Sequence, residues 1–108
     1  MSIELPTVLE AYFASENAHN TSAIEEYFAT NATVRDEGKT IKGITAIKAW
    51  RIEASERYHH SVEPLAVFQR DGTLVVTGRV SGNFPGSPTT LSHIFELAGG
   101  KIASLEIR

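Results

Sequence analysis

The chain has 108 residues, of which 42% are hydrophobic, and its formal net charge at pH 7 is −3. This length predicts one domain over residues 1–108 with a hydrophobic core of its own. The mildly acidic balance, without a run of Lys or Arg, argues against nucleic acid and membranes as partners. The absence of cysteine excludes disulfides and thiolate chemistry. Because no basic, apolar leader or membrane-length apolar run occurs, we expect a cytoplasmic protein.

Two helical patterns open the sequence. Apolar residues from Leu5 to Phe13 recur at steps of three and four, which predicts an amphipathic helix over residues 6 to about 17. Ser22 and Glu25 then have the spacing of a capping box, so we expect a short second helix to begin there. The apolar face of this second helix is formed by Ile24, Tyr27 and Phe28.

A short strand is predicted over residues 33–36, followed by a turn at Gly38. Side chains alternate between the two faces of a strand, so Asp36 shares a face with Val34. If that face is the interior, the pKa of Asp36 is raised by its apolar surroundings, which suits a general base. The alternative is that Asp36 caps the turn or pairs with a cation such as Lys39.

The third helical pattern begins after Gly43 and is the longest in the chain. Its charged residues, Arg51 among them, are placed mostly off the core-facing stripe. That stripe consists of Ile44, Ile47, Trp50, Ala54 and Tyr58.

The second half of the chain changes to a strand period. We expect strands over Val62–Gln69, Leu74–Ser81, Thr89–Leu97 and Ile102–Ile107, with a Pro- and Gly-rich loop at residues 83–88. Three N-terminal helices followed by a four-stranded meander predict an α+β fold, with the helices packed on one face of the sheet. A sheet of this kind twists and curves around the helices, which leaves a cone-shaped cavity for a small ligand.

The opposite face of the sheet must meet either water or a partner. Alternation in the third predicted strand turns His93 and Phe95 towards the helices and Ile94 outwards, and it places Ala103 of the last strand on the inner side. A face that mixes Val, Ile and Thr with a few charges is typical of a two-fold interface. We therefore expect a homodimer formed through the outer sheet face.

Two short motifs and the order of the elements resemble the nuclear transport factor two-like superfamily. The motifs are Tyr27–Phe28–Ala29 leading to Ala32–Thr33–Val34–Arg35–Asp36, and Gly43–Ile44–Thr45–Ala46–Ile47–Lys48–Ala49–Trp50. Within this superfamily the chain looks most like the small SnoaL-like proteins related to polyketide cyclases and ketosteroid isomerases. The resemblance covers essentially the whole chain and implies a cystatin-like fold, in which a curved, mainly antiparallel sheet encloses a conical cavity with the helices.

The similarity to ketosteroid isomerase implies candidate catalytic residues. That enzyme uses an Asp base and a Tyr that donates a hydrogen bond to the dienolate oxygen, and these positions match Asp36 and Tyr12. Its third residue, a protonated Asp on a late strand, falls near His93, where this chain has no carboxylate. His93 is therefore a candidate donor in its place. The alternatives are that Tyr12 and His93 belong to the packed core.

We expect an apolar and partly aromatic cavity wall and no cofactor. Adjacent histidines in a strand point to opposite faces, so His59 and His60 cannot share one ion with Glu63, and we expect no metal. The candidate ligand-binding residues are Phe13, Tyr27, Phe28, Val34, Trp50, Tyr58, Phe95 and Leu105.

Three functions are consistent with the sequence. The first is an isomerase, cyclase or lyase that moves a proton next to a carbonyl of a small apolar substrate, with Asp36 as base and Tyr12 or His93 polarising the oxygen. The second is a module that binds a small apolar molecule without chemistry. The third is a dimeric interaction protein with a vestigial cavity.

Overall fold

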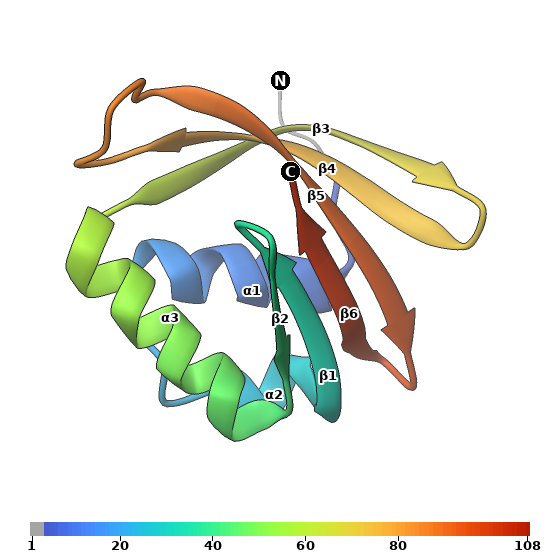
Figure 1. Ribbon diagram of the computed structural model, residues 1–108. Helices are drawn as coiled ribbons and strands as arrows, with labels where there is room; N and C mark the ends of the chain where they lie inside the picture. The colour runs from blue at the N-terminus through green and yellow to red at the C-terminus, as the bar shows by residue number, and fades with distance from the viewer. Residues whose placement is uncertain (1–3) are drawn as a thin grey trace.

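The computed structural model describes residues 4–108 and has an α+β fold (Figure 1). Its helices are α1 (Thr7–Asn17), α2 (Ile24–Tyr27) and α3 (Ile44–Tyr58), and its strands are β1 (Phe28–Asp36), β2 (Lys39–Lys42), β3 (Ser61–Arg70), β4 (Thr73–Ser81), β5 (Thr89–Ala98) and β6 (Lys101–Ile107). The six strands form one sheet in the order β2-β1-β6-β5-β4-β3, in which only β1 and β6 run parallel. The predicted fold class, with helices on a curved, mainly antiparallel sheet, is confirmed.

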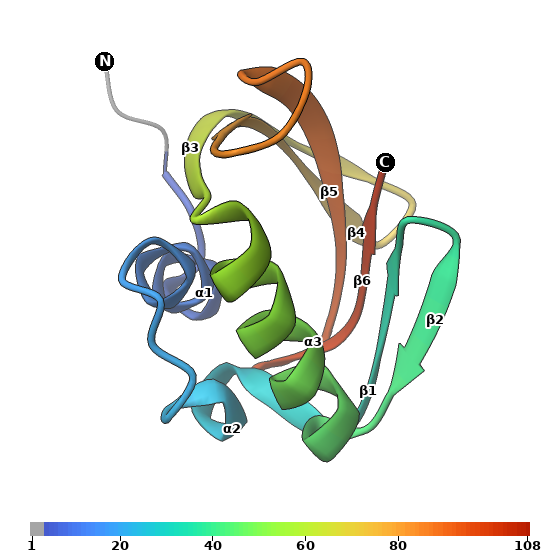
Figure 2. The same ribbon diagram turned by 60° about the vertical axis from the view of Figure 1, so that its left-hand side comes forward.

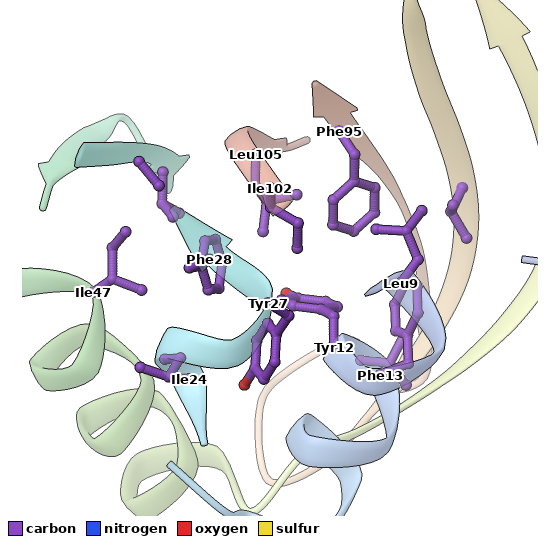
Figure 3. Packing of buried hydrophobic residues seen from close by; sticks show 14 of the residues in the cluster. Leu9, Tyr12, Phe13, Ile24, Tyr27, Phe28, Ile47, Phe95, Ile102 and Leu105 are labelled. Atoms are coloured by element: carbon purple, nitrogen blue, oxygen red, sulfur yellow. The ribbon is translucent and has the colours of Figure 1, made fainter. Parts of the chain in front are cut away.

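The helices α1 and α3 lie against the concave side of this sheet (Figure 2). At the centre of the core between them, the ring of Tyr12 makes edge-to-face contacts with Phe13, Phe28 and Phe95, at centroid distances between 5.0 and 5.9 Å (Figure 3). These aromatic contacts join α1 to both β1 and β5. The dense packing therefore sits under the middle of the sheet.

The sheet is larger than the predicted meander. β1 begins at Phe28, five residues before the predicted start, and pairs with β2 across the turn at Gly38. β2 has four residues, of which Ile41 is half-buried and the other three are exposed. Because so few of its residues are apolar, the sequence shows no alternation that would predict a strand here.

The capping box predicted at Ser22 and Glu25 is wrong. The backbone N–H and the hydroxyl of Ser22 both donate to Oδ1 of Asn20. The helix α2 begins after Ala23, which forms no side-chain cap, and has only four residues. The Asn20 side chain holds this connection as a turn, which competes with a longer helix.

Strand alternation correctly assigns the faces of β5. His93 and Phe95 are 1% and 0% exposed and pair with Val76 and Leu74 of β4, whereas Glu96 is exposed. In β6, a bulge opposite the Glu96–Leu97 step shifts the alternation. Ile102 is fully buried as a result, so the prediction that Ala103 occupies the inner side at this end is wrong.

The loop between β4 and β5, residues 82–88, is tied to the end of α3. The backbone N–H of Asn83 donates to the carbonyl of Tyr58 over 2.7 Å, and the ring of Phe84 packs against the ring of Tyr58. Gly82 allows this approach, because a Cβ at this position would lie only 2.7 Å from the Tyr58 carbonyl oxygen. The loop arches over the C-terminal end of α3 in Figure 2. Within residues 4–108, no helix has the length and apolar character needed to cross a membrane.

Candidate functional site

A pocket of about 500 Å³ lies between α3, the end of β1, the inner face of β3–β6 and the 82–88 loop. Its apolar lining includes Trp50, Ala54, Val62, Val80, Phe84 and Leu91. The ionisable residues that line it include Asp36, Glu16, Arg51, His60 and His93. A largely apolar pocket with a few polar groups is the usual form of a small-molecule site.

Asp36 is the last residue of β1 and lines this pocket. Alternation places it on the face of Val34, which is fully buried, as the sequence predicts. The Nε1–H of Trp50 donates to Asp36 Oδ2 over 3.0 Å. Within the described part of the chain the Asp36 carboxylate forms no ion pair, so pairing with Lys39 is not its role.

The pKa of Asp36 is raised from its ordinary value of 3.8. The largest cause is burial, which disfavours the charged carboxylate, and the nearby charge of Glu37 acts in the same direction. The hydrogen bond from Trp50 opposes them by favouring the ionised form. A carboxylate that holds a proton more readily than usual is a better proton acceptor for a carbon acid.

Replacing Trp50 by Phe tests the balance at Asp36. The change keeps an aromatic ring and removes the N–H donor that favours the ionised carboxylate, so we expect the pKa of Asp36 to rise further. The measurement is a ¹³C NMR titration of the carboxyl group in both proteins. Tyr58→Phe is the matched control, because it removes a donor to Glu37 rather than to Asp36. A fall in the Asp36 pKa in Trp50→Phe would contradict this assignment.

Four further groups, here called the buried cluster, lie deeper in the pocket: Glu16 of α1, Arg51 of α3, His60 before β3 and His93 of β5. His60 Nε2 lies 2.8 Å from Glu16 Oε2, and since a carboxylate only accepts, His60 donates from this nitrogen. The Arg51 guanidinium carbon lies 4.9 Å from the ring centroid of Tyr12 and 5.6 Å from that of Trp50.

Burial and neighbouring charges set the ionisation of Glu16 and of His93 in the buried cluster. Burial alone would raise the pKa of Glu16, but the His60 hydrogen bond and the Arg51 charge outweigh it, so the pKa is lowered and the carboxylate is ionised. Burial lowers the pKa of His93, which is therefore neutral at neutral pH. Within the cluster, Glu16 is therefore an anion beside the Arg51 cation, and the imidazole of His93 is neutral.

Sequence reasoning did not find Glu16, Arg51 or His60 as site residues. Glu16 follows Tyr12 by four residues, so it lies on the apolar stripe of α1. Arg51 likewise follows Ile47 by four, and placing it off the stripe is wrong, since it is 1% exposed. His60 is buried and His59 is exposed, but strand alternation is not the reason: β3 begins only at Ser61, and His59 is the left-handed C-cap of α3. The His60 side chain pairs with Glu16.

The structure separates the other predicted residues into two groups. Trp50, Tyr58 and His93 line the pocket with Asp36. Tyr12 does not line the pocket. It is fully buried in the core next to Arg51, so the prediction that it forms part of the cavity wall is corrected. The same correction applies to Phe13, Tyr27, Phe28, Val34, Phe95 and Leu105. The physical reason is that α1 packs directly on the sheet, so the open space lies towards the C-terminal half of α3.

Comparisons with known proteins agree with this architecture. The sequence model of a protein family described as the SnoaL-like domain matches residues 9–105. A proposed polyketide cyclase from Sinorhizobium meliloti is 38% identical, with 96% of this chain and 95% of that chain covered and a TM-score of 0.92. A comparison with curated proteins found no match.

Two more distant structures share the fold. A protein from Catenulispora acidiphila with a ketosteroid isomerase-like fold, solved with trimethylamine, is 20% identical over 97% of this chain and 86% of that chain, with a TM-score of 0.83. A nuclear transport factor two-like protein of unknown function from Cytophaga hutchinsonii is 15% identical over 100% of this chain and 91% of that chain, with a TM-score of 0.79. The chain therefore belongs to the SnoaL-like domain family.

Proposed function

We propose that the protein binds a small, largely apolar molecule in the pocket and catalyses cofactor-free proton transfer next to a carbonyl, with Asp36 as the base. The observation that carries this proposal is the partly buried Asp36 carboxylate, which faces the pocket with its pKa raised by burial. The relative described as a proposed polyketide cyclase supports the same class of chemistry, since cyclisation of a polyketide begins with loss of a proton beside a carbonyl.

The proposed step uses groups that line the pocket. Asp36 accepts a proton from the carbon acid and becomes neutral, while the negative charge moves to the substrate oxygen as an enolate. His93 lines the pocket and is neutral, and in the proposed step its imidazole N–H donates to that oxygen. Tyr12 is not assigned this role, because it does not line the pocket. The neutral Asp36 then returns the proton to the same or another carbon.

Deuterium exchange tests this proposal without knowledge of the natural substrate. A panel of cyclic ketones and 1,3-dicarbonyl compounds is incubated with the protein in D₂O, and loss of the C–H signals is followed by NMR. We expect the protein to accelerate exchange for at least one compound, and Asp36→Asn to lose this acceleration. Binding without acceleration of exchange would instead favour the alternative, a non-catalytic module that sequesters a small molecule.

We also propose a homodimer through the outer face of the sheet. Phe68 of β3, Val75 of β4 and Ile94 of β5 are opposite one another in register on that face; Phe68 is 46% exposed, Ile94 is half-buried and Val75 between them is 7% exposed. Apolar side chains in such a row favour a partner over water.

The dimer is tested with a charge at its centre. Ile94→Asp is expected to shift the mass measured by light scattering from two chains to one, because a buried carboxylate in the interface has no partner there. Thr45→Asp, an exposed change at the start of α3, is the control and should leave the mass unchanged. A wild-type mass of one chain at all concentrations would rule the dimer out.

A further inference from the structure

Arg51 has more hydrogen-bond donors than its surroundings satisfy. A guanidinium carries five N–H donors, and this one is 1% exposed. Its Nη1 lies 3.4 Å from the Tyr27 hydroxyl, but Nε and Nη2 have no hydrogen-bond partner in residues 4–108. Because a buried charged donor without an acceptor is costly, stability alone does not explain an arginine at this position.

The two unpartnered nitrogens have a recognisable shape. Nε and Nη2 lie side by side along one edge of the planar guanidinium, here called the Arg51 edge, and this edge matches the two oxygens of a carboxylate. The rings of Tyr12 and Trp50 pack near the guanidinium and restrict its plane. The ring contacts use the positive charge, and the Tyr12 hydroxyl oxygen does not act as an acceptor for the Arg51 edge, since it too is buried without a hydrogen-bond partner in residues 4–108.

Although Glu16 Oε1 is buried without a hydrogen-bond partner in residues 4–108, the carboxylates of Glu16 and Asp36 each accept from one donor, His60 and Trp50 respectively. Among residues 4–108, neither of them forms an ion pair with Arg51. Arg51 nevertheless lines the pocket, so an acceptor can reach it from a molecule that enters there.

We propose that Arg51 binds the carboxylate of a small organic acid whose apolar part occupies the pocket. Trp50 contacts both ends of this arrangement, since its N–H bonds Asp36 and its ring packs near Arg51. An acid anchored at Arg51 therefore lays its adjoining carbons along Trp50 towards Asp36. The inference rests on the proposed function for the role of Asp36, and it names the substrate class as carboxylic acids that carry an acidic C–H bond.

The test compares the affinity of the protein for small carboxylic acids with its affinity for the corresponding uncharged amides. Trp50 is the only tryptophan and lines the pocket, so its fluorescence reports binding. The probes are phenylacetate, phenylpropanoate and phenylbutyrate, each paired with its primary amide, which has nearly the same shape without the charge. We expect the wild type to bind at least one acid about tenfold or more tightly than the matching amide, as a charge-assisted bidentate contact requires.

Substitution of Arg51 identifies the group responsible. Arg51→Lys keeps the positive charge and removes the paired donors, so we expect it to lose most of the preference for the acid while amide affinity changes less than about threefold. Arg57→Gln, on the exposed side of the same helix, is the matched control and should keep the preference. Thermal melting by circular dichroism checks that each variant folds, and the comparison of acid with amide in the wild type needs no variant.

Two results would overturn the inference. One is a wild type that prefers none of the three acids over its amide. The other is an equal loss of acid affinity in Arg51→Lys and Arg57→Gln. Neither result depends on catalysis. Deuterium exchange without acid preference would support the proposed function and overturn this inference. Acid preference without deuterium exchange would support binding of the carboxylate by Arg51 and contradict the proposed catalysis.

Discussion

Asp36→Asn is expected to lower the rate of proton transfer by about 10² to 10⁴-fold, the usual contribution of a general base. The amide has the same shape and can still accept the hydrogen bond from Trp50, but it cannot take up the substrate proton. Ligand affinity should change much less than the rate, because the step that is lost occurs only in the transition state. Deuterium exchange gives the rate and Trp50 fluorescence gives the affinity. A variant that keeps most of its exchange rate would show that another group is the base.

The same variant should fold at least as well as the wild type at neutral pH, which makes it a clean kinetic probe. The folded-state pKa of Asp36 is raised, so the ionised carboxylate is disfavoured by folding. This penalty is complete above the folded-state pKa and disappears as pH falls through that value to the ordinary value of 3.8. The stability gained in Asp36→Asn should therefore be largest at neutral pH and shrink in acid, as urea unfolding at several pH values can show.

Glu16→Ala is expected to lower the free energy of unfolding by about 3 kcal/mol, the range found when a buried polar pair loses one partner. The change removes the acceptor for His60 and the buried negative charge near Arg51. Urea unfolding at neutral pH measures the loss. Glu10→Ala, an exposed change on the same helix, should alter the free energy of unfolding by less than about 0.5 kcal/mol. Equal effects of the two substitutions would show that Glu16 contributes nothing through its partners.

The contribution of Glu16 also has a predicted pH dependence. Its folded-state pKa lies below the ordinary value of 4.5, because the His60 bond and the Arg51 charge outweigh burial. The resulting stability is present above pH 4.5 and is lost as pH falls through the folded-state pKa. The difference in unfolding free energy between the wild type and Glu16→Gln should therefore shrink in acid, and a difference that is constant with pH would contradict this.

The spacing of apolar residues along the sequence predicts most of the fold, because one side of each helix or strand faces the core and the other faces solvent. The alternation around His93 and the position of Asp36 beside Val34 follow from the strand period alone. The bulge in β6 does not, since it depends on pairing with β5. The strand β2 is also missed, because it packs too little apolar surface to leave a pattern.

The site is harder to predict for a different reason. Glu16 and Arg51 lie on apolar helical stripes, but a charged residue at such a position normally indicates solvent, and only the tertiary structure shows the partners that allow burial. Tyr12 illustrates the reverse case. The position of Tyr12 in the apolar repeat of α1 shows that its side chain faces inwards. Only the packing of α1 on the sheet shows that no open space remains beside the ring.

The measurement that tests the role of Asp36 most directly is the pH titration of its side-chain carboxyl group by ¹³C NMR in the ligand-free protein. Comparison with the spectrum of Asp36→Asn assigns the resonance. A base that faces the apolar pocket titrates above the ordinary value of 3.8, because burial disfavours its charge. A midpoint at or below 3.8 would show that the ionised carboxylate is fully stabilised by its neighbours, and would contradict the assignment of Asp36 as the base.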